Sequence, residues 1–492
     1  MNRPSESAAA SVEPFLDGVS SRSESEATLS VTSPSNGLPL VTIPAGCEAD
    51  VDRAVASARR AFVEGFWSNA PATFRAEALY RLSGLISENA AALDALDAGE
   101  MGKPVHEAFN SASGAASLTR FYAGAVDKLT GDVYSSDERS FAAQRRVPRG
   151  VVAAIVPWNF PTHNAVMKIA PALAGGNSVV LKPSELASRS AVRLAQLALQ
   201  AGVPRGVFNV VPGLGEVVGR ALGLHQDVDM VAFTGSTVVG KQILQYAGQS
   251  NMKVVLAECG GKAPHIVFSD GLDLDAVAEH IARMLVTNQG QICSVGSRLL
   301  VERSVESRLV ERIALRVKDV VVGDPLDATT TYGPLASAQQ CARVMHYIEL
   351  GRTEGATLVT GGGRSLPDSG GYFVEPTIFR NVAPSARIAQ EEIFGPVLSV
   401  IGFDSEEDAV RIANGTAYGL MAYVWTADLS RAMRLVKRIR SGLLVNAAPP
   451  AGEGPGDAIS WEPVGQSGVG TEGGLPGMES YMRRQLVWIN HV

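Results

Sequence analysis

The stretch Val151-Val-Ala-Ala-Ile-Val-Pro-Trp-Asn-Phe-Pro161 places a continuous apolar run directly before a polar turn, and a helical segment follows at 163–174. The same order of apolar run and amphipathic segment then recurs along the chain. The further apolar runs cover 177–181, 207–211 and 230–233, and the further helical segments cover 188–200, 216–223 and 237–247. Continuous apolar strands between amphipathic helices are typical of a parallel sheet covered on both faces. A second series at about 264–445 predicts a second open α/β sheet.

Helical spacing of apolar residues also predicts helices before this stretch, at 50–67, 73–98 and 105–126. The segment from Lys128 to Arg146 is polar and irregular, and it ends in an alternation that favours a strand. No repeat of fixed period and no long low-complexity linker separates these parts. We therefore expect the domains to pack closely.

The composition limits the classes of function that this chain can have. With 492 residues, 46% of them hydrophobic, the chain is long enough for two or three domains with cores of their own. A net charge of −7 and a pI near 5.6 argue against nucleic-acid binding, which needs a basic face. No apolar run approaches the roughly 20 residues that span a bilayer, so we expect no membrane association.

The cysteines and the N-terminal residues indicate the compartment. Four cysteines are far apart and form no CxxC pair: Cys47, Cys259, Cys293 and Cys341. We therefore expect neither a disulfide framework nor a metal site, and a reducing cytoplasm is the natural location. Residues 1–12 lack the apolar core of a secretory signal and predict a short disordered tail.

One cysteine lies in a setting that suits a nucleophile. The segment Asn288-Gln-Gly-Gln-Ile-Cys-Ser-Val-Gly-Ser-Arg298 surrounds Cys293 with small residues, which leave the sulfur sterically reachable. We expect Gly290 and Gly296 to let a substrate or cofactor approach the backbone. The alternative is that Cys293 is a small buried hydrophobic residue, as isolated cysteines usually are.

Two polar side chains follow predicted strands at positions where they could act on a substrate. Asn159 follows the first strand, and an asparagine amide can donate to a developing oxyanion; a turn before Pro161 is the alternative. Glu258 follows the apolar run 254–257. A carboxylate at the end of a buried strand is costly unless it is paired or functional, and burial can raise its pKa towards that of a general base.

Two further strand ends suit a dinucleotide. Lys182 and Glu185 of the segment Lys182-Pro-Ser-Glu185 can hold the hydroxyls of an adenosine ribose, and the carboxylate would repel a 2′-phosphate. A solvated ion pair is the alternative. Phe233-Thr-Gly-Ser236 leads into a helix whose free N–H groups suit a pyrophosphate, and Gly215 could add a close approach. The alternative is an ordinary capped helix that binds no ligand.

Taken in order, these motifs resemble those of the NAD(P)-dependent aldehyde dehydrogenases, from about Phe15 to the end of the chain. The matching series is PWNFP, KPSE, FTGS, E-x-GGK, GQxC, EEIFGPV, NxxxYGL and SGxGxEGG. The resemblance implies a Cys293 nucleophile, a Glu258 general base and an Asn159 oxyanion donor. It also implies a supporting proton relay of Lys168 and Glu472.

The resemblance extends to the cofactor and to the substrate. The cofactor contacts that it implies are Ile155, Trp158, Lys182, Ser184, Glu185, Gly215, Phe233, Ser236, Val239, Cys259, Glu392 and Phe394. The substrate channel that it implies is lined by Phe160, His163, Asn164, Met167 and Trp461. NAD is the expected cofactor, with NADP as the second choice.

The fold that the resemblance implies is α/β, with a Rossmann-like NAD-binding domain, a catalytic domain and a small bridging β arm. In this chain we expect the NAD-binding domain at 1–125 and 149–258 and the catalytic domain at 259–463. The arm and the C-terminal segment would be 126–148 and 464–492. Such arms pair across subunits, which implies a homodimer or homotetramer.

The expected reaction is the oxidation of an aldehyde to its carboxylic acid with NAD, through a cysteine thiohemiacetal and a thioester. One alternative passes the acyl group to coenzyme A or phosphate, but the retained Glu258 argues against it because a thiol acceptor needs no such base. A second alternative is a non-catalytic structural or binding homologue. A thiol hydrolase is a third, which leaves the KPSE and FTGS motifs unexplained.

Three departures from the family pattern concern the substrate. Cys259 stands where a leucine is usual, and Ser460-Trp-Glu-Pro-Val-Gly-Gln466 replaces the usual Pro-Phe-Gly-Gly-x-Lys. Thr162, His163 and Asn164 stand where the family often has apolar residues. A polar channel would favour an aldehyde with a polar or aromatic-polar body over a long alkyl chain. Alternatively, His163 and Asn164 pair with nearby backbone, as buried polar groups usually do.

Overall fold

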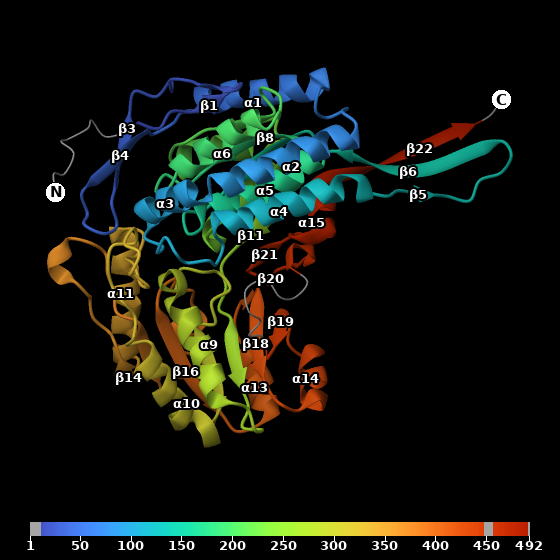
Figure 1. Cartoon of the computed structure of the whole chain (residues 1–492). Helices are drawn as coiled ribbons and strands as arrows, with labels where there is room; N and C mark the ends of the chain where they lie inside the picture. The colour runs from blue at the N-terminus through green and yellow to red at the C-terminus, as the bar shows by residue number, and fades with distance from the viewer. Residues whose placement is uncertain (1–10, 447–455, 491–492) are drawn as a thin grey trace.

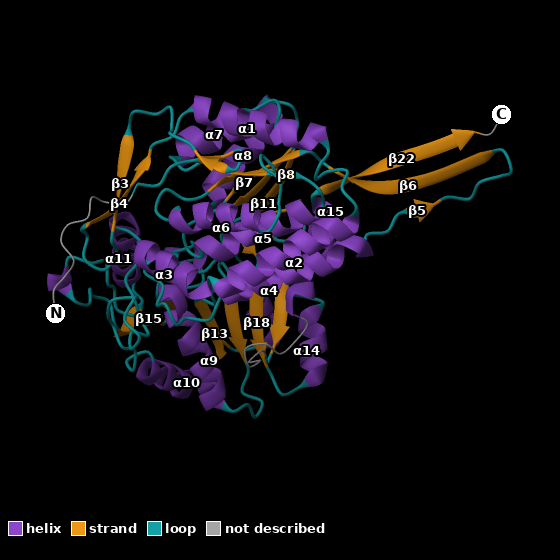
Figure 2. Ribbon diagram, turned by 45° about the horizontal axis from the view of Figure 1, so that its top comes forward, coloured by secondary structure: helices purple, strands orange, loops and turns teal. Residues whose placement is uncertain are grey.

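The computed structural model describes residues 11–446 and 456–490, and within these ranges an eight-stranded and a seven-stranded sheet form the framework. Of the tail expected at 1–12, residues 1–10 lie outside the described residues. Figure 1 shows the blue and green N-terminal half around the first sheet and the yellow and orange part around the second. Helices flank both sheets (Figure 2). The α/β fold class is therefore confirmed.

The first sheet has the order β2-β1-β9-β8-β7-β10-β11-β21. Its parallel strands are β7 (Val151–Ile155), β8 (Ser178–Lys182), β9 (Phe208–Val210), β10 (Met230–Thr234) and β11 (Val254–Glu258). Its antiparallel strands are β1 (Phe15–Leu16), β2 (Val19–Ser20) and β21 (Gly468–Val469). The chain moves outward from β7 to β9 and returns to β10 beside β7. Ligands bind at such a reversal of strand order, outside the carboxyl ends of the strands.

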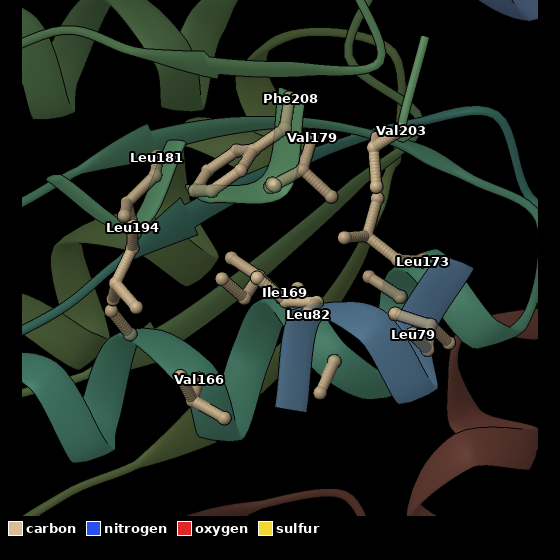
Figure 3. Packing of buried hydrophobic residues seen from close by; sticks show 14 of the residues in the cluster. Leu79, Leu82, Val166, Ile169, Leu173, Val179, Leu181, Leu194, Val203 and Phe208 are labelled. Atoms are coloured by element: carbon tan, nitrogen blue, oxygen red, sulfur yellow. The ribbon is translucent and has the colours of Figure 1, made fainter. Parts of the chain in front are cut away.

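Helices cover both faces of this sheet because its central strands are apolar on both sides. The helices of this half are α1 (Glu48–Glu64), α2 (Ala72–Glu88), α3 (Ala90–Met101), α4 (Ala112–Ala125), α5 (Pro161–Ala174), α6 (Arg189–Gln200), α7 (Arg220–Leu224) and α8 (Thr237–Gln249). Figure 3 shows Val179 and Phe208 of the sheet packed over Ile169 of α5, with Leu82 of α2 beneath. Burial of this kind is the main stabilising contribution, at about 25 cal/mol per Å² of apolar surface.

The predicted helices are present, and three of the predicted segments differ most from the observed elements. The segment predicted at 73–98 divides at Asn89 into α2 and α3. The helix predicted from 105 begins only at Ala112, where the Ser111 side chain accepts a hydrogen bond from the Gly114 N–H and caps it. The segment at 216–223 is a π-turn (Gly215–Gly219) followed by α7. These ends depend on capping and packing, which apolar spacing does not report.

The second sheet has the order β14-β15-β16-β13-β12-β18-β19. Its strands are β12 (Pro264–Val267), β13 (Arg298–Glu302), β14 (Thr357–Thr360), β15 (Thr377–Arg380), β16 (Val397–Phe403), β18 (Met421–Trp425) and β19 (Gly442–Val445). Its helices are α9 (Leu274–Val286), α10 (Arg303–Arg316), α11 (Ala338–Thr353), α12 (Arg387–Gln390), α13 (Glu406–Ala413) and α14 (Leu429–Val436). Cys293 lies in the connection that leads into β13.

The remaining strands join the sheets or project from them. They are β3 (Thr28–Thr32) with β4 (Pro39–Pro44), β17 (Tyr418–Gly419) with β20 (Val464–Gly465), and β5 (Asp132–Val133) with β6 (Ser140–Pro148) and β22 (Met482–Asn490). Strand β20 pairs with the second half of the chain and β21 pairs with β11, so 464–469 ties the halves together. The ribbon of β5, β6 and β22 projects from the body (Figure 1), and α15 (Gly474–Ser480) precedes it.

Candidate active site

The loop that carries Cys293 lies against the segment that follows β11. At Gly261 an added side-chain carbon would come within 2.2 Å of the Cys293 carbonyl oxygen, so glycine alone permits this contact. Glu258 ends β11 and is buried. Its charge is close enough to raise the pKa of the Cys293 thiol. The expected nucleophile and base therefore meet where the two halves of the chain join.

Asn159 is held against the same loop from the other side. Its side-chain Nδ2 donates to the Gln291 carbonyl oxygen at 2.9 Å, two residues before the thiol. Asn288 Nδ2 in turn donates to the Asn159 carbonyl oxygen at 2.9 Å. An amide carries two N–H donors, so the Asn159 side chain keeps a second donor for a ligand.

The thiol of Cys293 is half-buried and unionised in this environment. Burial raises its pKa to about 12, and the charges of Glu392 and Glu258 act in the same direction. Phe160 packs with Ile292 and Val295 on either side of it, which adds to the desolvation. Because the thiolate is the reactive form, Cys293 needs a cation or a base close to it during the reaction.

Glu258 belongs to a buried group of ionisable side chains. Burial raises its pKa to about 8 and the Glu472 charge adds to this, whereas the Lys168 charge and the Trp461 indole N–H lower it. Lys168 Nζ lies 2.5 Å from Glu472 Oε1, and both side chains are buried. Among the described residues neither Glu258 Oε1 nor Glu472 Oε2 has a hydrogen-bond partner. The two free oxygens are acceptors that suit a water molecule.

The residues expected to hold the ribose and the pyrophosphate of the cofactor lie at the carboxyl edge of the first sheet. Lys182 Nζ lies 3.3 Å from Glu185 Oε2 at the end of β8. Ser236 caps α8, and its Oγ accepts from the Val239 N–H. At Gly215 an added side-chain carbon would meet nothing within 4 Å, so the backbone there is open to a ligand. Ile155, Ser184 and Phe233 are buried beside these groups.

Three further cofactor contacts that the resemblance implies, Trp158, Glu392 and Phe394, connect the two halves of the chain. Glu392 Oε1 accepts from the Gly261 N–H at 2.9 Å, and burial raises the pKa of Glu392 to about 6. Phe394 has φ +60°, and its ring meets Trp158 edge-on with centroids 5.4 Å apart. A helix N-terminus at the strand-order reversal of the first sheet, together with a carboxylate and an aromatic pair, fits an NAD molecule.

Cys259, the departure next to the expected base, is buried rather than reactive. Its sulfur faces α8, where an added carbon on Gly240 would come within 2.5 Å of it. Burial raises the pKa of this thiol to about 12. The side chain thus fills the space below the start of α8.

The five residues implied for the substrate channel have different surroundings. Phe160 packs beside the thiol loop, and the Trp461 indole lies by Glu258. Met167 packs partly against the core of the first half. Asn164 donates to the Asn159 side chain, and His163 faces Gly114 on α4. Burial lowers the pKa of His163 to about 4, so its imidazole is neutral at physiological pH.

One expectation about the thiol loop was wrong. Gly290 and Gly296 do not open the backbone to a ligand, because protein atoms occupy the space of their missing side chains. An added carbon at Gly290 would come within 2.6 Å of the Gly395 carbonyl oxygen. At Gly296 it would come within 2.1 Å of the His265 ring. Both glycines serve internal packing.

Two residues of α11 support the cofactor segment and were not recognised in the sequence. Gln340 Nε2 donates to the Phe394 carbonyl oxygen at 2.7 Å. Arg343 donates to the Glu392 and Ile393 carbonyl oxygens. These bonds hold the segment in which Phe394 has its left-handed conformation. A polar pair at i and i+3 was the only available signal, and most such pairs are solvated.

Within residues 11–446 and 456–490, no group of three or more His, Cys, Asp or Glu side chains could hold a metal ion. No helix within the same residues is long and apolar enough to cross a membrane.

Comparison with known proteins agrees with this arrangement. The model of the aldehyde dehydrogenase family matches residues 21–487. The chain is 41% identical to the NADP/NAD-dependent aldehyde dehydrogenase PuuC of Escherichia coli (strain K12), over 97% of this chain and 95% of that protein. It also superimposes on a solved indole-3-acetaldehyde dehydrogenase in complex with NAD⁺, with TM-score 0.94, 44% identity and coverage of 97% and 96% of the two chains.

A second solved structure, the gamma-glutamyl-gamma-aminobutyraldehyde dehydrogenase of Burkholderia cenocepacia, matches with TM-score 0.93 and 45% identity. The match covers 97% of this chain and 96% of that one. A family model over nearly the whole length, relatives above 40% identity and the site geometry agree with one another. The chain belongs to the aldehyde dehydrogenase family, whose members oxidise aldehydes to carboxylic acids with NAD(P).

Proposed function

We propose that Cys293 is the nucleophile of this NAD-dependent oxidation, with Asn159 as oxyanion donor and Glu258 as general base. The observation that carries the proposal is the convergence of all three on one loop. Asn159 donates to Gln291, and the segment after Glu258 packs on the Cys293 carbonyl through Gly261. The Asn159–Gln291 contact joins residues that are 132 positions apart.

In the first half of the reaction the Cys293 thiol releases its proton to water, and the resulting thiolate bonds to the aldehyde carbon. The carbonyl oxygen becomes an oxyanion, which the second N–H of Asn159 and the backbone N–H of Cys293 stabilise. Preorganised donors of this kind contribute about 3–4 kcal/mol each. NAD, when bound, supplies the hydride acceptor, so that an acyl group is left on the sulfur as a thioester. Lys182, Glu185, Ser236, Glu392 and Phe394 are the residues that would hold the cofactor.

In the second half Glu258 acts on a water molecule. The ionised carboxylate accepts a proton from water, the oxygen bonds to the thioester carbon, and the carbon–sulfur bond breaks. The unpartnered Glu258 and Glu472 oxygens provide acceptors for that water, and Lys168 balances the Glu472 charge. Because a thiol acceptor would not need this base, we favour water over coenzyme A.

NAD is the preferred form of the cofactor in this proposal. Glu185 would face the ribose 2′ position and repel a 2′-phosphate, which favours NAD by about tenfold or more. Initial rates with the two cofactors give the measurement. Equal kcat/KM for NAD and NADP would contradict the assignment.

The substrate in this proposal has a polar or aromatic-polar body. The support is the neutral His163 on α5, for which no hydrogen bond is made among the described residues, and Trp461 beside Glu258. The solved relatives are named for indole-3-acetaldehyde and gamma-glutamyl-gamma-aminobutyraldehyde. Both aldehydes carry nitrogen-containing bodies rather than plain alkyl chains.

We further propose the domain roles and the assembly. Residues 1–125 and 149–258 would bind NAD, and 259–463 would carry the catalytic loop. Residues 126–148 and 464–492 would be the oligomerisation arm and the C-terminal segment, and the arm would pair between subunits. The support for pairing is the projecting ribbon, in which β6 and β22 run side by side from Ser140 opposite Asn490 to Pro148 opposite Met482. Four separate free thiols suit a reducing cytoplasm.

The test of the mechanism is a rapid-mixing measurement of NADH with an aldehyde in excess. Cys293→Ala should form no NADH while NAD binding, measured by calorimetry, stays near that of the parent enzyme. Glu258→Gln should keep a burst of about one NADH per site and lose steady turnover, because acylation precedes the water step. NADH formation by folded Cys293→Ala would refute the nucleophile, and loss of the Glu258→Gln burst would place the glutamate in an earlier step.

A further inference from the structure

We propose that Asn164 is a positioning residue, which sets the orientation of the Asn159 side-chain amide. The inference rests on the proposed function, in which Asn159 donates to the substrate oxyanion. Asn164 Nδ2 donates to Asn159 Oδ1 at 3.1 Å. The residues are 8% and 5% exposed, so water does not compete freely for this bond. Family resemblance assigns Asn164 only to the channel wall.

The orientation matters because the two ends of an amide have nearly the same shape and opposite hydrogen-bonding character. With Oδ1 towards Asn164, Nδ2 faces the thiol loop and donates to the Gln291 carbonyl. If the amide turned over, Oδ1 would face the Gln291 carbonyl oxygen and Nδ2 would face the Asn164 NH2 group. An acceptor would then stand where the oxyanion develops, and repulsion would replace stabilisation.

Two contacts select the productive orientation, and they act on opposite ends of the amide. The Gln291 carbonyl oxygen accepts from one N–H of Asn159 Nδ2, the nitrogen whose second N–H serves the substrate. Asn164 acts on Oδ1, the end of the amide that does not serve the substrate. Asn164 therefore fixes the orientation of the amide without occupying a donor that the oxyanion needs.

Helix geometry explains why position 164 can do this. Asn159 precedes α5, and Asn164 lies in its first turn, where its N–H donates to the Phe160 carbonyl oxygen at 2.8 Å. Side chains in an α-helix lean towards its N-terminus, which directs Asn164 towards Asn159. Lys168 follows one turn later and contacts Glu472. One stripe of α5 thus supports the oxyanion donor at one end and the surroundings of the base at the other.

The experiment is a double-mutant cycle, read from the rate of the NADH burst. The four proteins are the parent, Asn164→Leu, Asn159→Ala and the double variant, with melting temperature as the check on folding. Asn164→Leu should slow the burst about tenfold with the NAD dissociation constant unchanged. Asn159→Ala should slow it about a hundredfold or more. The double variant should be no slower than Asn159→Ala alone, because the group that Asn164 positions is gone.

The outcomes distinguish a failure of the Asn164 inference from a failure of the proposed function. If Asn164→Leu slows the burst equally with and without Asn159, Asn164 acts only on the structure and the inference is overturned. An unchanged burst in Asn164→Leu overturns it as well. If Asn159→Ala keeps the parent burst, the oxyanion role of Asn159 is refuted, which is a failure of the proposed function and not of the contact alone.

A pH profile of Asn164→Asp adds a readout that a packing defect would not produce. The ionised aspartate accepts instead of donating and favours the inverted amide, whereas the protonated form donates again. The ratio of burst rates, Asn164→Asp over Asn164→Leu, should therefore rise as the pH falls through the pKa of the introduced carboxyl. This ratio cancels the titration of Cys293 that the variants share. A ratio independent of pH between 5 and 9 (roughly the range in which the carboxyl titrates) would overturn the inference.

If Asn164→Leu does not fold, Asn164→Asp and Asn164→Ser replace it in the cycle.

Discussion

At the scale of single residues, opposing effects set the pKa of the Glu258 carboxyl. Burial, the largest effect, and the Glu472 charge favour the protonated acid, while the Lys168 charge and the Trp461 indole favour the ionised base. The raising effects prevail and the pKa reaches about 8. At pH 7 the protonated form of Glu258 therefore predominates. The rate of the water step should depend on this equilibrium.

We therefore predict that steady turnover rises with pH through about 8 when hydrolysis of the thioester limits the rate. Glu472→Gln removes a negative charge and lowers the pKa of Glu258. The rising limb of the plot of kcat against pH should therefore move to lower pH. Lys168→Met removes a positive charge, raises that pKa and should move the limb to higher pH. The measurement is kcat against pH for the three proteins.

Trp461→Phe provides the matched control for this prediction. It keeps an aromatic ring and loses the indole N–H that lowers the pKa of Glu258. Its limb should also move to higher pH, by less than that of Lys168→Met because no full charge is removed. Limbs that move in the same direction for Glu472→Gln and Lys168→Met would contradict the electrostatic account.

At the scale of an element, α5 combines three tasks along its length. It begins at Pro161, directly after the catalytic turn, and its inner face packs on the first sheet through residues such as Ile169 (Figure 3). One stripe holds Asn164 and Lys168 against the catalytic side chains. His163 lies on a third side, opposite Gly114 of α4. A substitution there should change selectivity without removing the catalytic contacts.

We predict that His163→Leu increases kcat/KM for alkyl aldehydes, and that the gain grows with chain length. An apolar wall gains about 25 cal/mol per Å² of hydrocarbon buried, and the neutral imidazole forfeits part of this gain. His163→Gln, which keeps a polar side chain of similar reach, is the control and should show no such trend. The measurement is a series of unbranched aldehydes of rising length. A flat response in His163→Leu would show that His163 does not set the channel polarity.

At the scale of the whole molecule, the ribbon of β5, β6 and β22 projects from the body without covering its own apolar residues (Figure 1). Leu486, Trp488 and Ile489 are exposed by 61%, 68% and 50%. A free ribbon with exposed large apolar side chains is marginal in water, and pairing with another subunit would cover it.

We predict that the protein is a dimer or tetramer in light scattering coupled to size exclusion. Leu486→Lys with Trp488→Lys places charges on one side of β22, because alternate residues share a face, and should lower the mass towards that of a monomer. Val63→Lys on α1 also replaces an exposed apolar residue, 72% exposed, and should leave the mass unchanged. A parent protein that is monomeric at micromolar concentration would contradict the prediction.

Local patterns in the sequence were sufficient for the α/β class, for the strands that end at Lys182 and Glu258, and for the strand that ends at Ile155, before Asn159. Continuous apolar runs report burial on two faces, and this property survives in any packing of the elements. The family motifs then gave the prediction that Cys293 is the nucleophile and which segments hold the cofactor. The division of 73–98 at Asn89 and the late start of α4 were not predicted, because turn geometry and caps outweigh apolar spacing at element ends.

The tertiary structure alone decided which side chains act on one another. Lys168 meets Glu472 across 304 positions and Asn159 meets Gln291 across 132, and no local pattern encodes such pairs. The same holds for Gly290 and Gly296, whose missing side chains leave room for Gly395 and His265. Residue type states what a group can donate, accept or bury. Its pKa, its orientation and its partner depend on low-dielectric contacts that exist only once distant elements have packed.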